Sequence, residues 1–161
     1  GVQLLLVHGE RDPRVPREHA DAVADVVTRA ERDGSHSHGL FRIPGYVASL
    51  RSGKVKGDAD PTLSKRSPVV LHCDGDLGYA PLAHRRSLTA LAEAAKENGL
   101  ATLSLTRTHH FAALWPETET LGQHGLVAAA VRRATLLPVA LLLAFFRNVY
   151  LLDKTPHRRT S

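Results

Sequence analysis

The stretch from residue 69 to residue 106 constrains the fold most tightly, because it reads as a strand, a helix and a strand in succession. Residues 69–73 form a short apolar run bounded by Pro68 and by Asp74, which is typical of a strand. Residues 80–98 predict a long helix with an apolar face, and Gly99 follows as its C-cap. Residues 100–106 alternate as a second strand. This order predicts an α/β fold.

Further elements are predicted on both sides of this unit. A helix is expected from Pro16 to Arg32, and a short helix from Pro44 to about Leu50. Residues 53–67 are rich in lysine, glycine, aspartate and proline, which indicates a loop or an edge segment. Residues 111–123 favour a helix, and residues 125–131 are strand-like. The expected order is therefore helix, helix, strand, helix, strand, helix, strand.

Three regions are expected along the chain. Residues 1–52 form an N-terminal helical segment, residues 53–131 an α/β segment, and residues 132–161 a divergent apolar and basic tail. The apolar run at residues 136–146 is shorter than the ~20 residues that cross a bilayer. A membrane partner is therefore not expected.

Charge and cysteine content narrow the class of protein. The net charge is +5, but the basic residues are scattered and aromatic residues make up only 5% of the chain, so a nucleic-acid partner is not expected. One alternative remains: a basic module that associates with membranes or nucleic acid through Arg132, Arg133, the apolar run and the tail. The single cysteine, Cys73, suits the reducing cytoplasm.

Two histidine-containing turns carry the candidate chemistry. In the first, His38 and Arg42 would project from one face if a helix begins near Gly39. A guanidinium fork matches a carboxylate, and a histidine can exchange a proton near neutral pH. The second turn contains His109 and His110 at the junction between a strand and a helix, where α/β enzymes place reactive side chains.

The sequence gives less support to a metal site or to a common nucleotide-binding site. A small metal-binding protein would use His36, His38, His109 and His110, but no acid accompanies them at a recognisable ligand spacing. Neither a Gly-x-Gly-x-x-Gly motif nor a Walker A motif occurs, so an ordinary Rossmann or P-loop site has no support. The residues alone indicate a carboxylate-binding α/β enzyme with a histidine acid.

Three longer segments resemble a known family. They are HADAVADVVTRAERDGSHSHGLFRIPGYVASLRSGKV at residues 19–55, DGDLGYAPLA at residues 74–83 and RTHHFAALWPETE at residues 107–119. Together they are similar to the type-2 malate/L-lactate dehydrogenases. Within that family, the HHFAALWPE phrase is closer to the Δ1-piperideine-2-carboxylate/Δ1-pyrroline-2-carboxylate reductases.

The resemblance implies a fold, a reaction and a set of site residues. The fold is an α/β fold other than Rossmann, with N-terminal helices and a small mixed sheet, in a homodimer whose substrate and nicotinamide meet between domains. The reaction is hydride transfer from NADPH or NADH to a small carboxylate substrate, a 2-oxo acid or a cyclic 2-imino acid. By position, His110 is the general acid/base and His38 a second catalytic histidine; Ser37, Arg42 and Tyr46 bind the substrate.

The resemblance covers about residues 16–131 and stops there. Residues 132–161 do not match what the family places after this point, where the cofactor domain is expected. We therefore expect a truncated chain that lacks most of the cofactor domain. Such a chain would keep the substrate-side motifs but would be weakly active or inactive.

Overall fold

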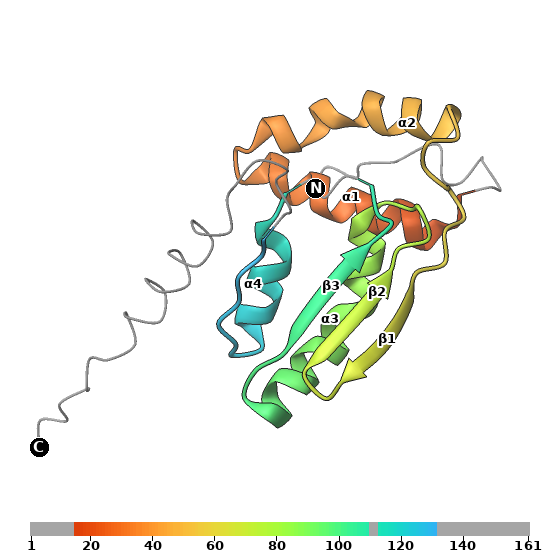
Figure 1. The fold of residues 1–161 in the computed structure, drawn as a ribbon. Coiled ribbons are helices and arrows are strands. Elements are labelled where there is room, and N and C mark those ends of the chain that lie inside the picture. Colours follow the sequence, from red (N-terminus) through yellow and green to blue (C-terminus); the bar gives the residue numbers. More distant parts are fainter. Residues whose placement is uncertain (1–14, 110–112, 132–161) are drawn as a thin grey trace, which may run out of the picture. The chain divides into compact units, whose positions relative to one another are not determined.

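The computed structural model describes residues 15–109 and 113–131, which Figure 1 colours along the chain. The helices are α1 (Arg17–Arg32), α2 (Ile43–Arg51), α3 (Ala80–Asn98) and α4 (Trp115–Gln123). The strands are β1 (Thr62–Ser67), β2 (Val70–Asp74) and β3 (Thr102–Thr106). Two short 3₁₀ turns, η1 (His36–His38) and η2 (Leu40–Arg42), connect α1 to α2.

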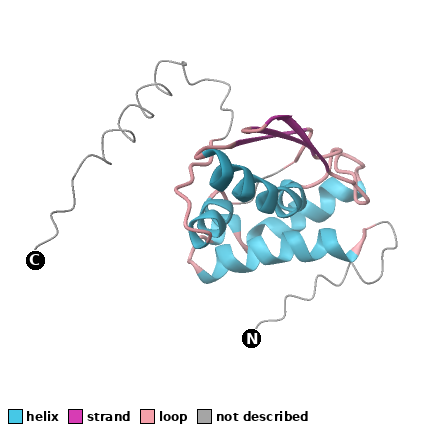
Figure 2. Cartoon of the chain, turned by 90° about the horizontal axis from the view of Figure 1, so that it is seen from below, coloured by secondary structure: helices cyan, strands magenta, loops and turns pink. Residues whose placement is uncertain are grey.

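The three strands form one mixed sheet in the order β1-β2-β3. β1 and β2 are an antiparallel hairpin, whereas β2 and β3 are parallel and are joined through α3. Leu71 and Cys73 of β2 are buried, at 0% and 1% exposure. In Figures 1 and 2 the helices lie on one side of this sheet. The predicted α/β class with a small mixed sheet is confirmed.

The bounds of α3 match the prediction residue for residue. The helix begins after Tyr79, which has an extended backbone, and ends at Gly99, whose φ of 78° places it in the left-handed region that favours glycine. α1 falls where the apolar spacing predicts it, and α2 begins one residue before and ends one residue after the short helix expected from Pro44 to about Leu50. The predicted edge segment at residues 53–67 contains β1, whose residues are all exposed.

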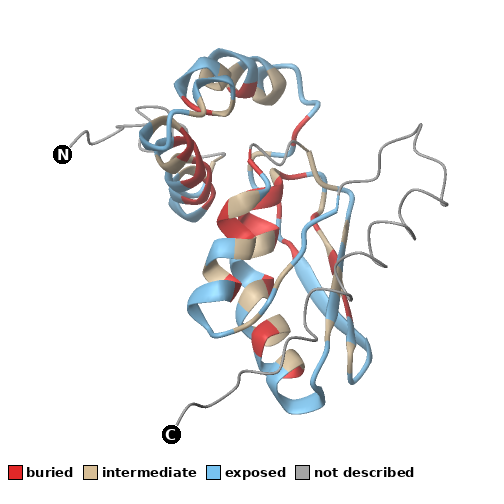
Figure 3. Cartoon of the chain, turned by 90° about the vertical axis from the view of Figure 1, so that its left-hand side faces the viewer, coloured by how far each residue is buried: buried red, intermediate tan, exposed pale blue. Residues whose placement is uncertain are grey.

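The core lies where α1 and α3 face one another and where α3 covers the sheet, as the buried positions in Figure 3 show. Val23 and Val27 of α1 pack against Tyr46 of α2. A smaller cluster joins Val26 of α1 to Ala113, with Trp115 of α4 packed against it. These two clusters fix the segments that flank both histidine motifs.

Two predictions about residues 111–131 are corrected. The helix starts only at Trp115: Ala113 and Leu114 precede it outside the helix, and residues 111 and 112 lie outside the described residues. The prediction of a strand at residues 125–131 was wrong. α4 ends in a turn with Gly125 at a φ of 76°, and residues 126–131 pair with no strand in the described part of the chain.

Candidate functional site

The first histidine motif forms two separate 3₁₀ turns. Ser37 Oγ and His38 Nδ1 lie 3.0 Å apart in η1, and the Arg42 Nε–H of η2 donates to the Ser37 carbonyl oxygen at 2.7 Å. The prediction of one helix face carrying His38 and Arg42 was wrong, because Gly39 has a non-helical backbone (φ −91°, ψ −140°) between the turns. Ser37 nevertheless brings both residues together.

These groups are open to solvent to different degrees. Ser37 is exposed, and His38 and Arg42 are half-buried. Within residues 15–109 and 113–131, Arg42 forms no ion pair with a carboxylate. A hydroxyl, an imidazole and a guanidinium therefore share one short surface segment, residues 37–42. This set of groups can bind an anion and exchange a proton with it.

Glu31, in the last turn of α1, contacts both 3₁₀ turns. Its Oε1 lies 2.6 Å from His36 Nδ1, and its Oε2 accepts the Leu40 backbone N–H at 2.9 Å. The Leu40 hydrogen bond first, and the His36 contact second, hold the pKa of the Glu31 carboxyl below its usual value. The carboxylate is therefore ionised at neutral pH.

Tyr46 lies beneath the turns in the core between α1 and α2. It is 7% exposed, and its ring meets that of Tyr79 edge-on, with centroids 5.0 Å apart. The Tyr79 hydroxyl donates to the Tyr46 carbonyl oxygen at 2.7 Å. Burial raises the pKa of each phenol to about 12, so both hydroxyls stay protonated at neutral pH. Tyr79 thus joins the first motif to the start of α3.

The second motif follows the ends of the parallel strands β2 and β3. A Cβ on Gly75 would lie 2.1 Å from the side chain of Thr108, so the loops after the two strands touch. The His109 backbone N–H donates to the Gly78 carbonyl oxygen at 2.8 Å, and the Ala80 N–H donates to the His109 carbonyl oxygen at 3.0 Å. These backbone bonds hold His109 at the N-terminus of α3, beside Tyr79.

His110, the predicted general acid, lies outside the described residues. The described residues on both sides of residues 110–112 contact the first motif or its neighbour. His109 pairs with Tyr79 in an isolated β-bridge, and the Trp115 ring meets the His38 ring at a centroid distance of 6.3 Å and an angle of 70°. The two motifs therefore approach each other from different parts of the chain.

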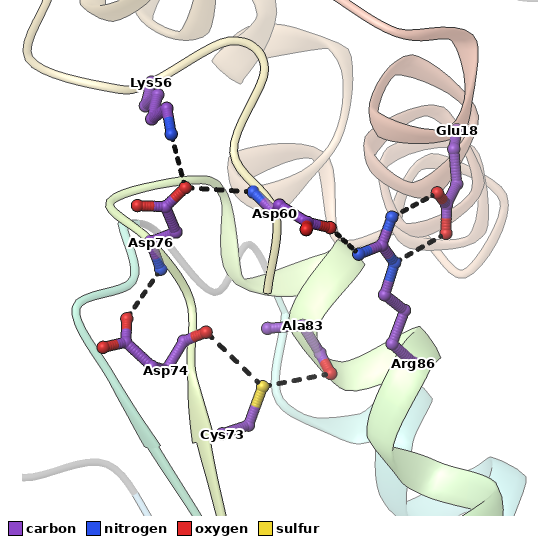
Figure 4. Close-up of polar contacts among 8 residues, drawn as sticks. All are labelled: Glu18, Lys56, Asp60, Cys73, Asp74, Asp76, Ala83 and Arg86. Carbon is purple, nitrogen blue, oxygen red and sulfur yellow. Dashed lines mark hydrogen bonds and ion pairs between the residues drawn. The ribbon is translucent and has the colours of Figure 1, made fainter. Parts of the chain in front are cut away.

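An ion network holds the loop between α2 and β1 against α1, α3 and β2 (Figure 4). Arg86 bridges Glu18 at 2.7 Å and Asp60 at 2.5 Å, and Asp76 accepts from Lys56 at 2.6 Å and from the Asp60 N–H at 3.1 Å. The Arg86 hydrogen bonds lower the pKa of Glu18, and the Lys56 contact lowers that of Asp76. This network supports the loop after β2.

The two positions that sequence reasoning missed are Glu31 and Tyr79. Each lies inside a segment that resembles the family, yet neither is a histidine, serine or arginine in a turn. Their contacts join residues that are 5, 9 and 33 positions apart, and no helical or strand period predicts such pairs. The bend at Gly39 creates the first two contacts, and the packing of Tyr79, just before α3, against Tyr46 creates the third.

The metal-binding alternative gains no support in the described part of the chain. No cluster of three or more histidine, cysteine or acidic side chains there could hold a metal ion. The described helices are also too short or too polar to cross a membrane. The predicted apolar run at residues 136–146 lies outside the described residues.

Comparison with known proteins adds a family and a set of relatives. The model for the family described as "Malate/L-lactate dehydrogenase" matches residues 11–142. The chain is 50% identical over 111 residues to a Δ1-pyrroline-2-carboxylate reductase of Ancylobacter novellus, covering 69% of the chain and 33% of that protein. It is 42% identical over 129 residues to one of Pseudomonas fluorescens, covering 80% and 37%.

A solved structure agrees with these matches. The crystal structure of Δ1-piperideine-2-carboxylate reductase from Pseudomonas syringae pv. tomato superposes with a TM-score of 0.67 at 41% identity. The match covers 70% of the chain and 34% of that protein. The chain therefore spans about a third of the length of the relatives it matches.

Proposed function

Because the chain belongs to the malate/L-lactate dehydrogenase family, we propose that it contributes the substrate-binding part of an oxidoreductase. Its substrate would be a cyclic 2-imino acid or a 2-oxo acid, reduced with NADPH or NADH. The observation that carries the proposal is that Ser37 contacts both His38 in its own turn and Arg42 in the next turn. The reductase names of the relatives support an imino acid similar to Δ1-pyrroline-2-carboxylate or Δ1-piperideine-2-carboxylate.

Arg42 binds the substrate carboxylate in this proposal. Its Nε–H donates a hydrogen bond to the Ser37 carbonyl oxygen. This bond orients the guanidinium plane and leaves the terminal N–H groups for the substrate. Arginine pairs with a carboxylate through two parallel hydrogen bonds, which fixes the orientation of a small ligand. Ser37 and His38 line the substrate, and the buried Tyr46 supports the pocket from below.

The proton in the reaction is assigned to histidine. Reduction of the C=N bond adds a hydride to carbon and a proton to nitrogen, and leaves a C–N single bond. His110 would give that proton, and His38 would lie beside the same heteroatom as the second catalytic histidine. General-acid assistance of this kind accelerates a reaction by roughly 10²–10⁴-fold. The hydride chemistry itself belongs to the nicotinamide cofactor.

The described residues near the site do not fit the diphosphate of that cofactor. Arg42 is assigned to the substrate, and three other described cations near the site are paired with carboxylates: Lys56 with Asp76, Arg86 with Glu18 and Asp60, and Arg107 with Asp74. No cofactor-binding role is therefore assigned to them. For this reason we expect the 161-residue chain alone to be weakly active or inactive with NADPH or NADH.

The remaining features of the proposal follow the family resemblance. The full enzyme would be a cytoplasmic homodimer, and the buried free thiol of Cys73 suits a reducing compartment. Residues 1–52 would supply the first catalytic turn and residues 53–131 the second. Residues 132–161 would stand apart as the divergent tail.

Binding of a reaction product tests the substrate assignment on the chain as it exists. L-proline is the product of reducing Δ1-pyrroline-2-carboxylate, and calorimetry can measure its affinity. We expect Arg42→Gln to weaken binding about tenfold or more, because charge-assisted hydrogen bonds to the carboxylate are lost. The exposed Arg66→Gln on β1 is the matched control. Equal affinities of wild type and Arg42→Gln would refute the assignment.

A further inference from the structure

One carboxylate spans the whole segment that carries Ser37 and His38. Glu31 Oε1 contacts the side chain of His36, the first residue of η1, and Oε2 accepts the N–H of Leu40, the first residue of η2. The two contacts lie on either side of residues 37–39. Glu31 therefore ties the start of one 3₁₀ turn to the start of the next.

The glycine between the turns makes room for this carboxylate. A Cβ on Gly39 would lie 2.1 Å from Glu31 Oε2 and 3.2 Å from the Glu31 Cα atom. Gly39 is buried, although the residues on both sides of it are half-buried or exposed. An alanine at this position would have to displace the carboxylate from the Leu40 N–H. The absence of a side chain at residue 39 and the presence of Glu31 are thus parts of one arrangement.

We propose that Glu31 is a positioning residue, which holds the Ser37–His38 turn and, through it, Arg42 in the geometry that binds substrate. The inference rests on the proposed function. Its physical basis is the chain of contacts from the Glu31 carboxylate to His36 and Leu40, and from the Ser37 carbonyl oxygen to Arg42 Nε. Glu31 itself need not touch the substrate.

Removal of the carboxylate has two expected effects. In Glu31→Ala, the Leu40 amide should exchange with solvent about tenfold faster, because its charged acceptor is lost. Affinity for L-proline should fall about fivefold or more, because the guanidinium of Arg42 then samples more orientations. Glu31→Gln keeps an oxygen for the Leu40 N–H and should restore part of both properties. Glu93→Gln, on the exposed side of α3, is the control.

Gly39→Ala provides an independent variant, because it keeps the carboxylate and moves it. We expect the same faster Leu40 exchange and weaker L-proline binding as in Glu31→Ala. If Glu31→Ala fails to fold, as judged by its urea unfolding curve, Gly39→Ala decides the question. Unchanged Leu40 exchange in the folded variants, or unchanged L-proline affinity despite faster exchange, would overturn the positioning role.

The experiment separates this inference from the proposed function. Failure of the wild-type chain to bind L-proline would count against the proposed function. The positioning role is then decided by exchange of the Leu40 amide and by the backbone chemical shifts of residues 37–42. If both stay unchanged in Glu31→Ala and in Gly39→Ala, Glu31 does not position the turn.

Discussion

The described part of the chain contains two glutamate–histidine pairs of nearly equal length in very different surroundings. Glu31 and His36 lie 2.6 Å apart with side chains 32% and 72% exposed. Glu117 and His84 lie 2.7 Å apart with side chains only 10% and 12% exposed. The first pair lies beside the candidate substrate turn. The second pair joins α3 to α4, and its residues are far in sequence from that turn.

Because the two pairs differ in burial, we expect the first to affect local conformation and the second to affect stability. Water screens the exposed pair, so its value lies in the local shape that it imposes on the turn. The buried pair has lost most of its hydration, and Glu117 Oε2 finds no hydrogen-bond partner in the described part of the chain. Both residues line a cleft of about 240 Å³ between α1, α3 and α4. Their effect should therefore appear in stability.

The largest expected effect follows removal of one buried partner. His84→Leu leaves the Glu117 carboxylate buried without the imidazole that it contacts, and we expect a loss of roughly 3–5 kcal/mol in the free energy of unfolding. Urea unfolding followed by the fluorescence of Trp115, the single tryptophan, measures it. The loss in Glu117→Leu should be smaller, because that variant removes the buried carboxylate itself.

The double variant sharpens this test. In His84→Leu/Glu117→Leu both polar groups are replaced by apolar ones, and stability should return toward the wild-type value. Glu93→Gln on α3 serves as the control for a surface glutamate. A His84→Leu variant as stable as this control would remove the energetic distinction between the two pairs.

How well the sequence predicts a region depends on whether local signals or contacts between distant residues determine its structure. The bounds of α3 were predicted because the apolar spacing and Gly99 are local signals. The 3₁₀ turns were not, since a contact between Glu31 and Leu40 depends on a bend at Gly39 that no period encodes. The strand expected at residues 125–131 was wrong, because a strand-like composition alone does not supply a pairing partner.

The site residues divide in a similar way. The motif identified Ser37, His38 and Arg42 as a group, and the structure brings them together through Ser37. The pairing of Tyr46 with Tyr79 links residues 33 positions apart and could follow only from tertiary packing. The sequence pattern thus indicated which side chains are candidates for binding and catalysis. It did not indicate which side chains hold them in place.

The next effect concerns a buried hydrogen bond without charge. Tyr79→Phe removes the hydroxyl that donates to the Tyr46 carbonyl oxygen while keeping the ring contact. We expect a loss of about 1 kcal/mol in the free energy of unfolding, the usual net value of such a bond. A loss as large as that of His84→Leu would show that charge adds little to burial. Urea midpoints of the two variants give the comparison.

Acid should affect buried and exposed groups in separate pH windows. Burial lowers the pKa of His19 below 6.5, so the folded state binds fewer protons and loses stability as pH falls below about 6.5. The pKa of Glu31 is also lowered, so its contribution is complete above 4.5 and is lost as pH falls through the folded-state value.

Unfolding midpoints from pH 7 to pH 3 test this order. His19→Gln should flatten the upper window, and Glu31→Gln should flatten only the lower one. Glu18 and Asp76 also titrate in the lower window, because ion pairs lower their pKa values. The Glu31 effect is therefore the difference between Glu31→Gln and wild type. A change in the upper window in Glu31→Gln would contradict the assignment.

The smallest expected effect is that of salt. It tests most directly whether the two glutamate–histidine pairs differ in exposure to solvent. At 1 M salt the screening length falls to about 3 Å, so the exposed contact between Glu31 and His36 should weaken while the buried pair should not. Leu40 amide exchange should therefore be faster at 1 M salt, because the weakened His36 contact no longer helps to hold the Glu31 carboxylate against the Leu40 N–H. His36→Gln should abolish this salt dependence and keep the Leu40 hydrogen bond to Glu31. If salt instead changes the stability difference between His84→Leu and wild type, water reaches the buried pair through the cleft, and the contrast between the two pairs is one of degree.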